Sequence, residues 1–179
     1  MQLVPSGPGL VPDAIHSLLL TTIYSARDEL VLTTPYFVPD ESLLTALKSA
    51  AQRGVHVTVI MPEKNDSRLV NYASRAHFFE LMKSGVRIML FRGGLLHSKT
   101  ITVDREFSLF GSVNLDMRSF WLNFEATLFI YDRTFADRIR TIQAHYEDDS
   151  VEVDINLVER RPAINRFMEN LALLIGPLL

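Results

Sequence analysis

The sequence predicts an α/β fold in which one mixed β-sheet is flanked by helices on both faces. Strand-like and helix-like segments alternate over residues 30–92, which is typical of parallel strands joined by helical crossovers. Two short β-rich runs, 99–104 and 107–110, follow each other so closely that they favour an antiparallel hairpin in the same sheet. The chain has 179 residues and is 47% hydrophobic, which is enough for one continuous core. We therefore expect one domain.

The first elements can be placed from capping residues and periodicity. Residues 1–12 hold three prolines and two glycines, so we interpret them as a linker from a missing N-terminal half. Asp13 is expected to cap a helix that runs to about residue 28. A β-rich run at 30–38, a helix at 41–53 that Gly54 ends, and a strand at 55–62 follow.

The second half of the chain continues the alternation. Ser67 is placed to cap a longer helix that stops at Gly85, and a strand begins at Val86. After the hairpin, the pattern predicts a strand from Glu125 and a helix over 132–146. We expect the main half-domain to cover residues 13–157.

Residues 158–179 are expected to form an amphipathic C-terminal tail. Its apolar residues recur at helical spacing on one stripe: Ile164, Phe167, Met168, Leu171 and Ile175. Packing of this stripe on the protein is the default interpretation. The alternative is contact with an anionic membrane surface, which the arginines at positions 160, 161 and 166 would favour.

Composition narrows the class of function. The formal net charge of −3 lacks the strong positive excess of dedicated duplex-DNA binders, so we expect no nucleic-acid partner. The absence of cysteine excludes thiol nucleophiles, thiolate zinc sites and disulfide scaffolds, and it fits a reducing compartment. The longest late apolar run, 171–179, is too short to span a bilayer.

Polar residues interrupt the apolar hairpin at regular offsets. His97 and Lys99 stand two residues apart, and Ser112 and Asn114 repeat that offset after Gly111. Residues two apart on a strand point to the same face, so these four side chains are expected to converge on one pocket. An imidazole, an ammonium, a hydroxyl and a carboxamide together suit a phosphoryl group.

With Asp104 the pattern reads H-x-K-x4-D-x6-G-S-x-N, which resembles the signature of the phospholipase D superfamily. The stretches TPYFVPDESLLTALKSAAQRGV, GVRIMLF and GSVNLDMRSFWLNFEA are similar to the C-terminal half of bacterial cardiolipin synthases. The resemblance implies a phospholipase D-like half-domain of a two-lobed enzyme. It also implies transfer of a phosphatidyl group through a phosphohistidine, without a metal or another cofactor.

By the same resemblance, cardiolipin forms from two phosphatidylglycerol molecules with release of glycerol. The N-terminal half of the same enzyme would supply the first motif, because no other histidine here is followed by lysine two residues later. His97 is then the general acid and base, and the role of nucleophile is the less favoured one. The expected location is the cytoplasmic face of a bacterial membrane, on an anionic lipid surface.

The remaining site residues receive supporting roles. Lys99 and Asn114 are expected to hold the non-bridging phosphate oxygens, with help from Ser112. Asp104 is expected to be a structural carboxylate at the turn, because its odd offset from Lys99 points it to the other strand face. Resemblance assigns Glu125 to orient His97. Candidate headgroup contacts are Tyr36, Asn71 and Arg92.

Two other functions stay open. A single-motif nuclease or phosphodiesterase of the same superfamily could pair two identical chains across a twofold axis. An inactive lipid-binding or assembly module could keep the fold without the chemistry. The other histidines, His16, His56, His77 and His145, are interpreted as structural or surface residues.

Overall fold

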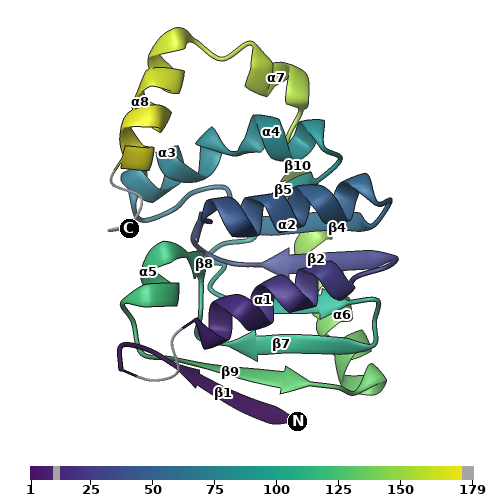
Figure 1. The fold of residues 1–179 in the computed structure, drawn as a ribbon. Helices are drawn as coiled ribbons and strands as arrows, with labels where there is room; N and C mark the ends of the chain where they lie inside the picture. Colours follow the sequence, from purple (N-terminus) through teal and green to yellow (C-terminus); the bar gives the residue numbers. More distant parts are fainter. Residues whose placement is uncertain (10–12, 175–179) are drawn as a thin grey trace.

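An eight-stranded sheet lies at the centre of the computed structural model, which describes residues 1–9 and 13–174 (Figure 1). The strand order is β1-β9-β7-β6-β2-β4-β5-β10, and β3 and β8 form a separate two-stranded sheet. The pairs β2–β4 and β4–β5 are parallel and the other neighbours in the large sheet are antiparallel. The prediction of a mixed sheet with an inserted hairpin is confirmed.

The elements occupy the following residues. The strands are β1 Gln2–Ser6, β2 Glu29–Thr33, β3 Phe37–Val38, β4 His56–Pro62, β5 Arg87–Phe91, β6 Thr100–Val103, β7 Phe107–Gly111, β8 Leu115–Asp116, β9 Glu125–Ile130 and β10 Ser150–Glu152. The helices are α1 Ala14–Ser25, α2 Glu41–Gln52, α3 Arg68–Ala76, α4 Phe78–Lys83, α5 Met117–Trp121, α6 Arg133–Asp148, α7 Ile155–Glu159 and α8 Ala163–Leu174.

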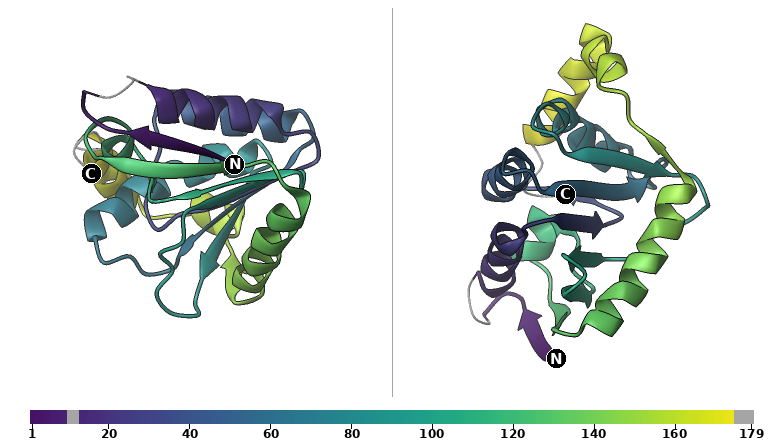
Figure 2. Two further views of the ribbon diagram at one scale, coloured as in Figure 1. Left: turned by 90° about the horizontal axis from the view of Figure 1, so that it is seen from below. Right: turned by 90° about the vertical axis from the view of Figure 1, so that its right-hand side faces the viewer.

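Helices cover both faces of the sheet, as predicted. Helices α1, α2 and α4 lie on one face and α6 lies on the other (Figure 2). The main core fills the first interface, where Leu19, Leu32, Leu47 and Leu81 are fully buried. A smaller apolar cluster under α6 is built from Val31, Ile60, Met89, Phe91 and Leu96, with Tyr146 of α6 packed against it. Burial on both faces explains why the central strands are almost continuously apolar.

Three expectations about elements are wrong. Residues 2–6 form the edge strand β1 instead of a linker, because they pair antiparallel with β9; residues 10–12 lie outside the described residues. The run 30–38 divides at Pro35 into β2 and β3, since proline removes a ladder donor. The helix from 68 divides into α3 and α4 at His77, whose N–H bonds the Ser74 carbonyl in a tighter turn.

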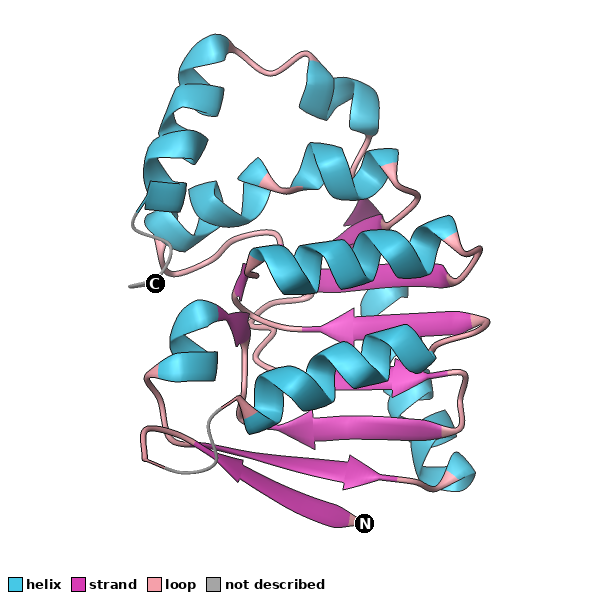
Figure 3. Cartoon of the chain, in the orientation of Figure 1, coloured by secondary structure: helices cyan, strands magenta, loops and turns pink. Residues whose placement is uncertain are grey.

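The last two helices, α7 and α8, lie away from the large sheet. Helices α7 and α8 form an arch over α3 and α4, and α8 packs along α3 (Figure 3). The predicted apolar stripe of α8 does not face the protein: Ile164, Phe167 and Leu171 are exposed, while Glu169 and Ala172 are buried. The default interpretation of the tail is therefore wrong for these residues. Ile175, the last residue of the predicted stripe, lies outside the described residues.

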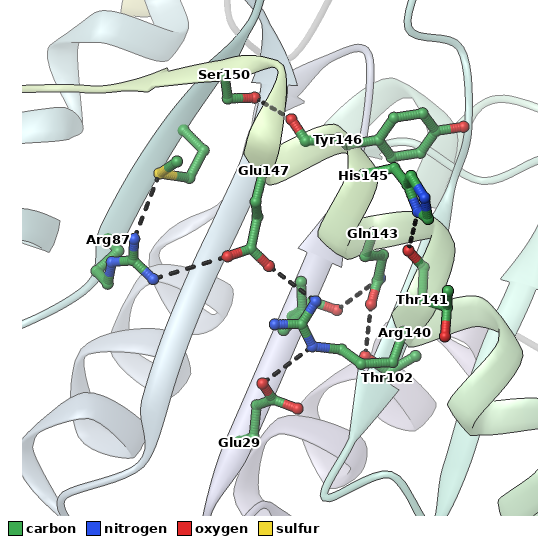
Figure 4. Close-up of polar contacts among 12 residues, drawn as sticks. Glu29, Arg87, Thr102, Arg140, Thr141, Gln143, His145, Tyr146, Glu147 and Ser150 are labelled. Carbon is green, nitrogen blue, oxygen red and sulfur yellow. Dashed lines mark hydrogen bonds and ion pairs between the residues drawn. The ribbon is translucent and has the colours of Figure 1, made fainter.

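Polar side chains of α6 fasten this helix to the sheet (Figure 4). Gln143 is fully buried; it donates to the Val31 carbonyl and to Thr100 Oγ1, and it accepts from Thr102 Oγ1 at 2.7 Å. Arg140 bridges Glu29 and Glu147, each at 2.9 Å. Because buried polar groups need partners, these contacts fix where α6 lies over β2 and β6. Those two strands lead into the candidate site.

Candidate active site

The motif residues lie at one edge of the sheet, where β2 and β7 end and β6 begins. The strand register places Thr33, Thr100 and Phe110 side by side across these three strands. The pairing continues one step further, since the Gly111 N–H donates to the Lys99 carbonyl at 3.3 Å. Both halves of the motif therefore meet at this edge, although they are more than ten residues apart in the chain.

His97 and Lys99 contact each other directly. They lie in the segment just before β6, outside the strand that we expected them to occupy, because β6 begins only at Thr100. Lys99 Nζ lies 3.1 Å from His97 Nδ1 and donates to the His97 carbonyl oxygen at 2.9 Å. The imidazole is exposed and the lysine half-buried. A ligand can thus reach the ring and the ammonium together.

The ammonium of Lys99 lies in a partly dry environment. Burial lowers the pKa of Lys99, and the carboxylates of Glu125 and Asp116 oppose this effect. An incompletely solvated cation gains free energy when it binds an anion, and the two carboxylates offset part of this gain. Both carboxylates come from the segment that follows the second half of the motif.

Ser112 presents its hydroxyl at the same edge. Its oxygen accepts the Ala126 N–H at 3.0 Å, and its distance to the Ala126 carbonyl is 3.5 Å, the limit of a hydrogen bond. The backbone of β9 thus holds the oxygen in place and leaves the hydroxyl proton only weakly engaged. Because Ser112 is exposed, this proton is available to a ligand oxygen.

A small polar chain orients Asn114. Its Nδ2 donates to Ser119 Oγ at 3.1 Å, and Asp116 Oδ1 accepts the Ser119 N–H at 2.6 Å. Burial raises the pKa of Asp116, and the hydrogen bonds from Ser119 oppose this effect. Asn114 Oδ1 is buried and has no partner among residues 1–9 and 13–174. One end of the carboxamide is therefore anchored and the other is unsatisfied.

Gly111 permits the close approach of β7 to β9 beside the site. A Cβ atom at this position would lie 2.3 Å from the Ala126 carbonyl oxygen and 2.8 Å from Thr127 Cα. Both are backbone atoms of a paired strand, so they cannot move aside as a flexible side chain would. The glycine of the motif is thus required by packing.

The structure does not bring Glu125 to His97. Glu125 begins β9 and accepts from Asn123 Nδ2 at 3.3 Å. Within the described part of the chain, the His97 ring contacts Lys99 and forms no ion pair with a carboxylate. No hydrogen bond joins Glu125 to His97 within the described residues; the negative charge of Glu125 instead acts on Lys99, where it opposes the lowering of the pKa.

Asp104 lies at the hairpin turn, at the far end of β6. Its carboxylate accepts three backbone N–H groups, from Arg27 at 3.0 Å and from Asp28 and Glu29 at 2.8 Å each. Asp104 and Arg105 both have left-handed backbone, with φ of 51° and 54°. This arrangement ties the hairpin to the start of β2 and leaves the carboxylate with no reacting atom to contact.

The three candidate headgroup residues are engaged with other side chains. The Tyr36 hydroxyl donates to Asp66 at 3.0 Å, and burial together with Asp66 raises the pKa of Tyr36. Asn71 Oδ1 accepts from Arg75, a neighbour on α3. Arg92 donates from Nε and Nη2 to Glu63 at 2.8 and 2.7 Å. The positive charge of Arg92 is therefore already neutralised.

Sequence reasoning missed Thr34 and the anchoring role of Ser119. Thr34 Oγ1 donates to the Tyr36 carbonyl and accepts the Leu115 N–H at 3.2 Å, so it joins the end of β2 to β8. The available signal for Ser119 is the Asp-x-x-Ser spacing after Asp116, which is typical of a helix N-terminus. For Thr34 no local signal exists, since its partner Leu115 is distant in the chain.

The site can bind a phosphoryl group and exchange a proton with it. Lys99 supplies charge, Ser112 supplies a hydrogen-bond donor, and the exposed imidazole of His97 is a group that can act as a general acid or base. Among residues 1–9 and 13–174, no group of three or more His, Asp or Glu side chains is arranged to hold a metal ion.

Known proteins share both the sequence and the fold. Residues 19–146 match the family model described as "Cardiolipin synthase, PLD-like domain". The chain is 51% identical over 179 residues to cardiolipin synthase A of Buchnera aphidicola subsp. Schizaphis graminum, and 53% identical over 176 residues to that of Citrobacter koseri. The two matches cover 100% and 98% of this chain, but only 37% and 36% of the relatives' own length.

Two solved structures show the same fold at low identity. Phosphatidylserine synthase of Haemophilus influenzae Rd KW20 superposes with a TM-score of 0.80 and 18% identity, over 99% of this chain and 48% of that one. The phospholipase D family member Nuc of Salmonella typhimurium superposes with a TM-score of 0.73 and 20% identity, over 85% and 96%.

Proposed function

Because the chain belongs to the cardiolipin synthase family of phospholipase D-like domains, we propose that it is one half of a phosphatidyltransferase that makes cardiolipin. The substrates are two phosphatidylglycerol molecules and the second product is glycerol. The chain spans little more than a third of the relatives that it matches, so the other half of the site would come from the rest of such a protein. The contact between His97 and Lys99 at an exposed edge carries this proposal.

The first step forms the covalent intermediate. A histidine of the N-terminal half attacks the phosphorus of phosphatidylglycerol, a P–N bond forms, and the P–O bond to the glycerol headgroup breaks. His97 in its protonated form gives its proton to the departing glycerol oxygen, so glycerol leaves as a neutral alcohol. Lys99 and Ser112 stabilise the charge that develops on the non-bridging oxygens.

The second step reverses these roles. The neutral imidazole of His97 takes the proton from the terminal hydroxyl of a second phosphatidylglycerol, and that oxygen attacks the phosphohistidine phosphorus. The P–N bond breaks, cardiolipin is released and the attacking histidine is free again. Asn114 uses one N–H of its Nδ2 on Ser119, and the second N–H would donate to the same phosphoryl group. Asp104 and Gly111 act only by holding the hairpin in place.

The location follows from the substrate. Every helix within the described residues falls short of what crossing a bilayer requires. A peripheral position on the cytoplasmic face of a bacterial membrane would give the site access to anionic phosphatidylglycerol. The N-terminal half and this lipid surface are then the two expected partners.

The proposal can be tested by product formation. Phosphatidylglycerol vesicles are incubated with the chain, with and without a separately expressed N-terminal half of a relative, and cardiolipin and glycerol are measured by mass spectrometry. We expect product with both halves and a loss of at least about 100-fold for His97→Ala, since general acid–base catalysis contributes this much. His145→Ala is the matched control, because His145 is exposed on α6 and bonds only its own helix.

Undiminished product from the His97→Ala variant would remove His97 from the mechanism. Salt-sensitive cleavage of DNA by a dimer of the chain, with no cardiolipin formed, would instead favour the nuclease alternative.

A further inference from the structure

The apolar side of helix α8 faces the solvent. Ile164, Phe167 and Leu174 are 63%, 61% and 78% exposed, and Met168 and Leu171 lie between them on the same side. We call these five residues the outer stripe. Glu169 and Ala172, in contrast, are only 4% and 1% exposed and face the protein. An amphipathic helix in water normally has the opposite orientation.

Specific contacts hold α8 in this orientation. Glu169 Oε1 lies 2.5 Å from Arg161 Nη1, and the same nitrogen donates to the Arg75 carbonyl at 3.1 Å. Ala172 is packed in a small cluster with Val70 and Ala73 of α3. Rolling the helix to bury the outer stripe would break the ion pair and force larger side chains against α3. The exposure of the stripe is therefore a consequence of the packing on the other side.

The net charge around the outer stripe is positive. Between Ala163 and Leu174 the helix has two charged residues: Arg166, which is exposed, and Glu169, which is buried and paired. Just before the helix, Glu159 and Arg160 are both exposed. The exposed charges of this segment therefore have a net positive sign, and an apolar stripe on such a segment fits the boundary between anionic headgroups and acyl chains.

The inner side of α8 lies at the same edge of the domain as the motif. Its cluster includes Val38 of β3, and Tyr36 and Met117 pack against it. Met117 begins α5, directly after the Ser112–Asp116 segment of the site. Figures 1 and 3 show α8, α3 and α5 along one side of the molecule, where β2 and β7 also end. A surface that receives α8 therefore lies on the same side of the molecule as the candidate active site.

We propose that α8 is an interfacial helix whose outer stripe enters an anionic phospholipid bilayer and holds the motif edge at the lipid surface. The choice of a bilayer as the occupant rests on the proposed function, in which both substrates are membrane lipids, and on the net positive charge of the exposed ionic side chains in this segment, Glu159, Arg160 and Arg166. The element acts by position only and contributes no reacting group.

Vesicle binding of the whole 179-residue chain tests this proposal. The chain is sedimented with vesicles of mixed phosphatidylglycerol and phosphatidylcholine. We expect the double variant Phe167→Glu, Leu171→Glu to reduce the partition coefficient at least about tenfold, because two apolar anchors are lost and two negative charges are added. Ile142→Glu is the matched control: Ile142 is 47% exposed but lies on α6, on the opposite face of the sheet. It should bind like the parent chain.

A fluorescent label measures the insertion itself. The chain has no cysteine, so Phe167→Cys and Ile142→Cys each give a unique attachment point for an environment-sensitive dye. We expect a blue shift on adding phosphatidylglycerol vesicles at position 167 and none at position 142. Circular dichroism of each variant checks that α8 is still folded.

Three results would overturn the inference: a parent chain that does not bind the vesicles, a double variant that binds as the parent does, and a dye at position 167 that responds to protein concentration instead of lipid. The last result would show that a second copy of the chain covers the stripe. The parent chain is also assayed for cardiolipin together with the N-terminal half. Intact vesicle binding by the parent chain without cardiolipin formation in that assay would count against the proposed function alone.

Discussion

Replacing Asp104 by alanine separates a structural role of this motif residue from a chemical one. The carboxylate accepts the backbone N–H groups of residues 27, 28 and 29, all at 2.8–3.0 Å, and it contacts no residue of the candidate active site among these hydrogen bonds. If its role is structural, Asp104→Ala should lower the free energy of unfolding and leave the activity of the folded fraction nearly unchanged.

The expected loss of stability is about 2–3 kcal/mol. The N–H groups of Arg27 and Asp28 are exposed, so water replaces the carboxylate and each bond contributes about 0.5 kcal/mol, whereas the part-buried Glu29 N–H contributes about 1 kcal/mol. The left-handed backbone of Asp104, with φ of 51°, adds roughly 1 kcal/mol for alanine. Asp104→Asn keeps one acceptor oxygen and tolerates this backbone, so we expect about half of the loss.

Urea unfolding followed by circular dichroism measures these differences. With a slope of about 2 kcal/mol per molar urea, the midpoint for Asp104→Ala should fall by roughly 1–1.5 M. Asp137→Ala is the control, because Asp137 is an exposed carboxylate 3.9 Å from Arg105 and should change the midpoint little. An Asp104→Ala variant that is as stable as the parent but has lost phosphatidyl transfer would refute the structural reasoning.

Gly111→Ala should destabilise the chain by about 2 kcal/mol or more, because the new Cβ would meet the backbone of β9; calorimetry would show this, and an unchanged melting temperature would contradict the close approach. Gln143→Leu should cost about 2–4 kcal/mol in urea unfolding, since it leaves the Thr100 and Thr102 hydroxyls buried without their partner; a neutral result would mean that the pair repacks. Burial lowers the pKa of Lys99 from its ordinary value of 10.5, so Lys99 loses its proton at a lower pH than a solvated lysine does. As the pH rises, activity should therefore begin to fall at a lower pH than it would with a solvated lysine. In a pH profile of kcat/KM, Lys99→Arg should move this fall in activity to a higher pH. A fall that stays at the same pH would show that another group causes it.

The sequence carried enough information to predict the candidate site, because its residues recur at short, regular offsets. His97 and Lys99 are two apart, as are Ser112 and Asn114, and a turn between them brings the two pairs together. These residues come together whenever the hairpin forms, whatever the rest of the fold is. The antiparallel pairing of β6 with β7 shows that the hairpin does form. The same locality explains why Ser67 could be recognised as a helix cap, whose hydroxyl accepts the Val70 N–H.

Contacts between distant segments could not be predicted in this way. Asp13 has the right residue type for a helix cap, but its φ of 61° leaves the side chain without a capping bond. Residues 2–6 read as a linker because only pairing with β9, more than a hundred residues away, makes them a strand. The influence of the Glu125 charge on the pKa of Lys99 likewise depends on where β9 enters the sheet.

The sequence by itself determined the fold class, the motif and the amphipathic character of the tail, because each depends on residue types at fixed separations along the chain. Only the tertiary structure decided which side of α8 faces inward. Hydrophobic periodicity favours burial of the Phe167 side, but the pairing of Glu169 with Arg161 and the packing of Ala172 on α3 bury the other side. A periodic pattern states that two sides of a helix differ; which of them meets the protein depends on the partner surface, and that surface exists only after the chain has folded.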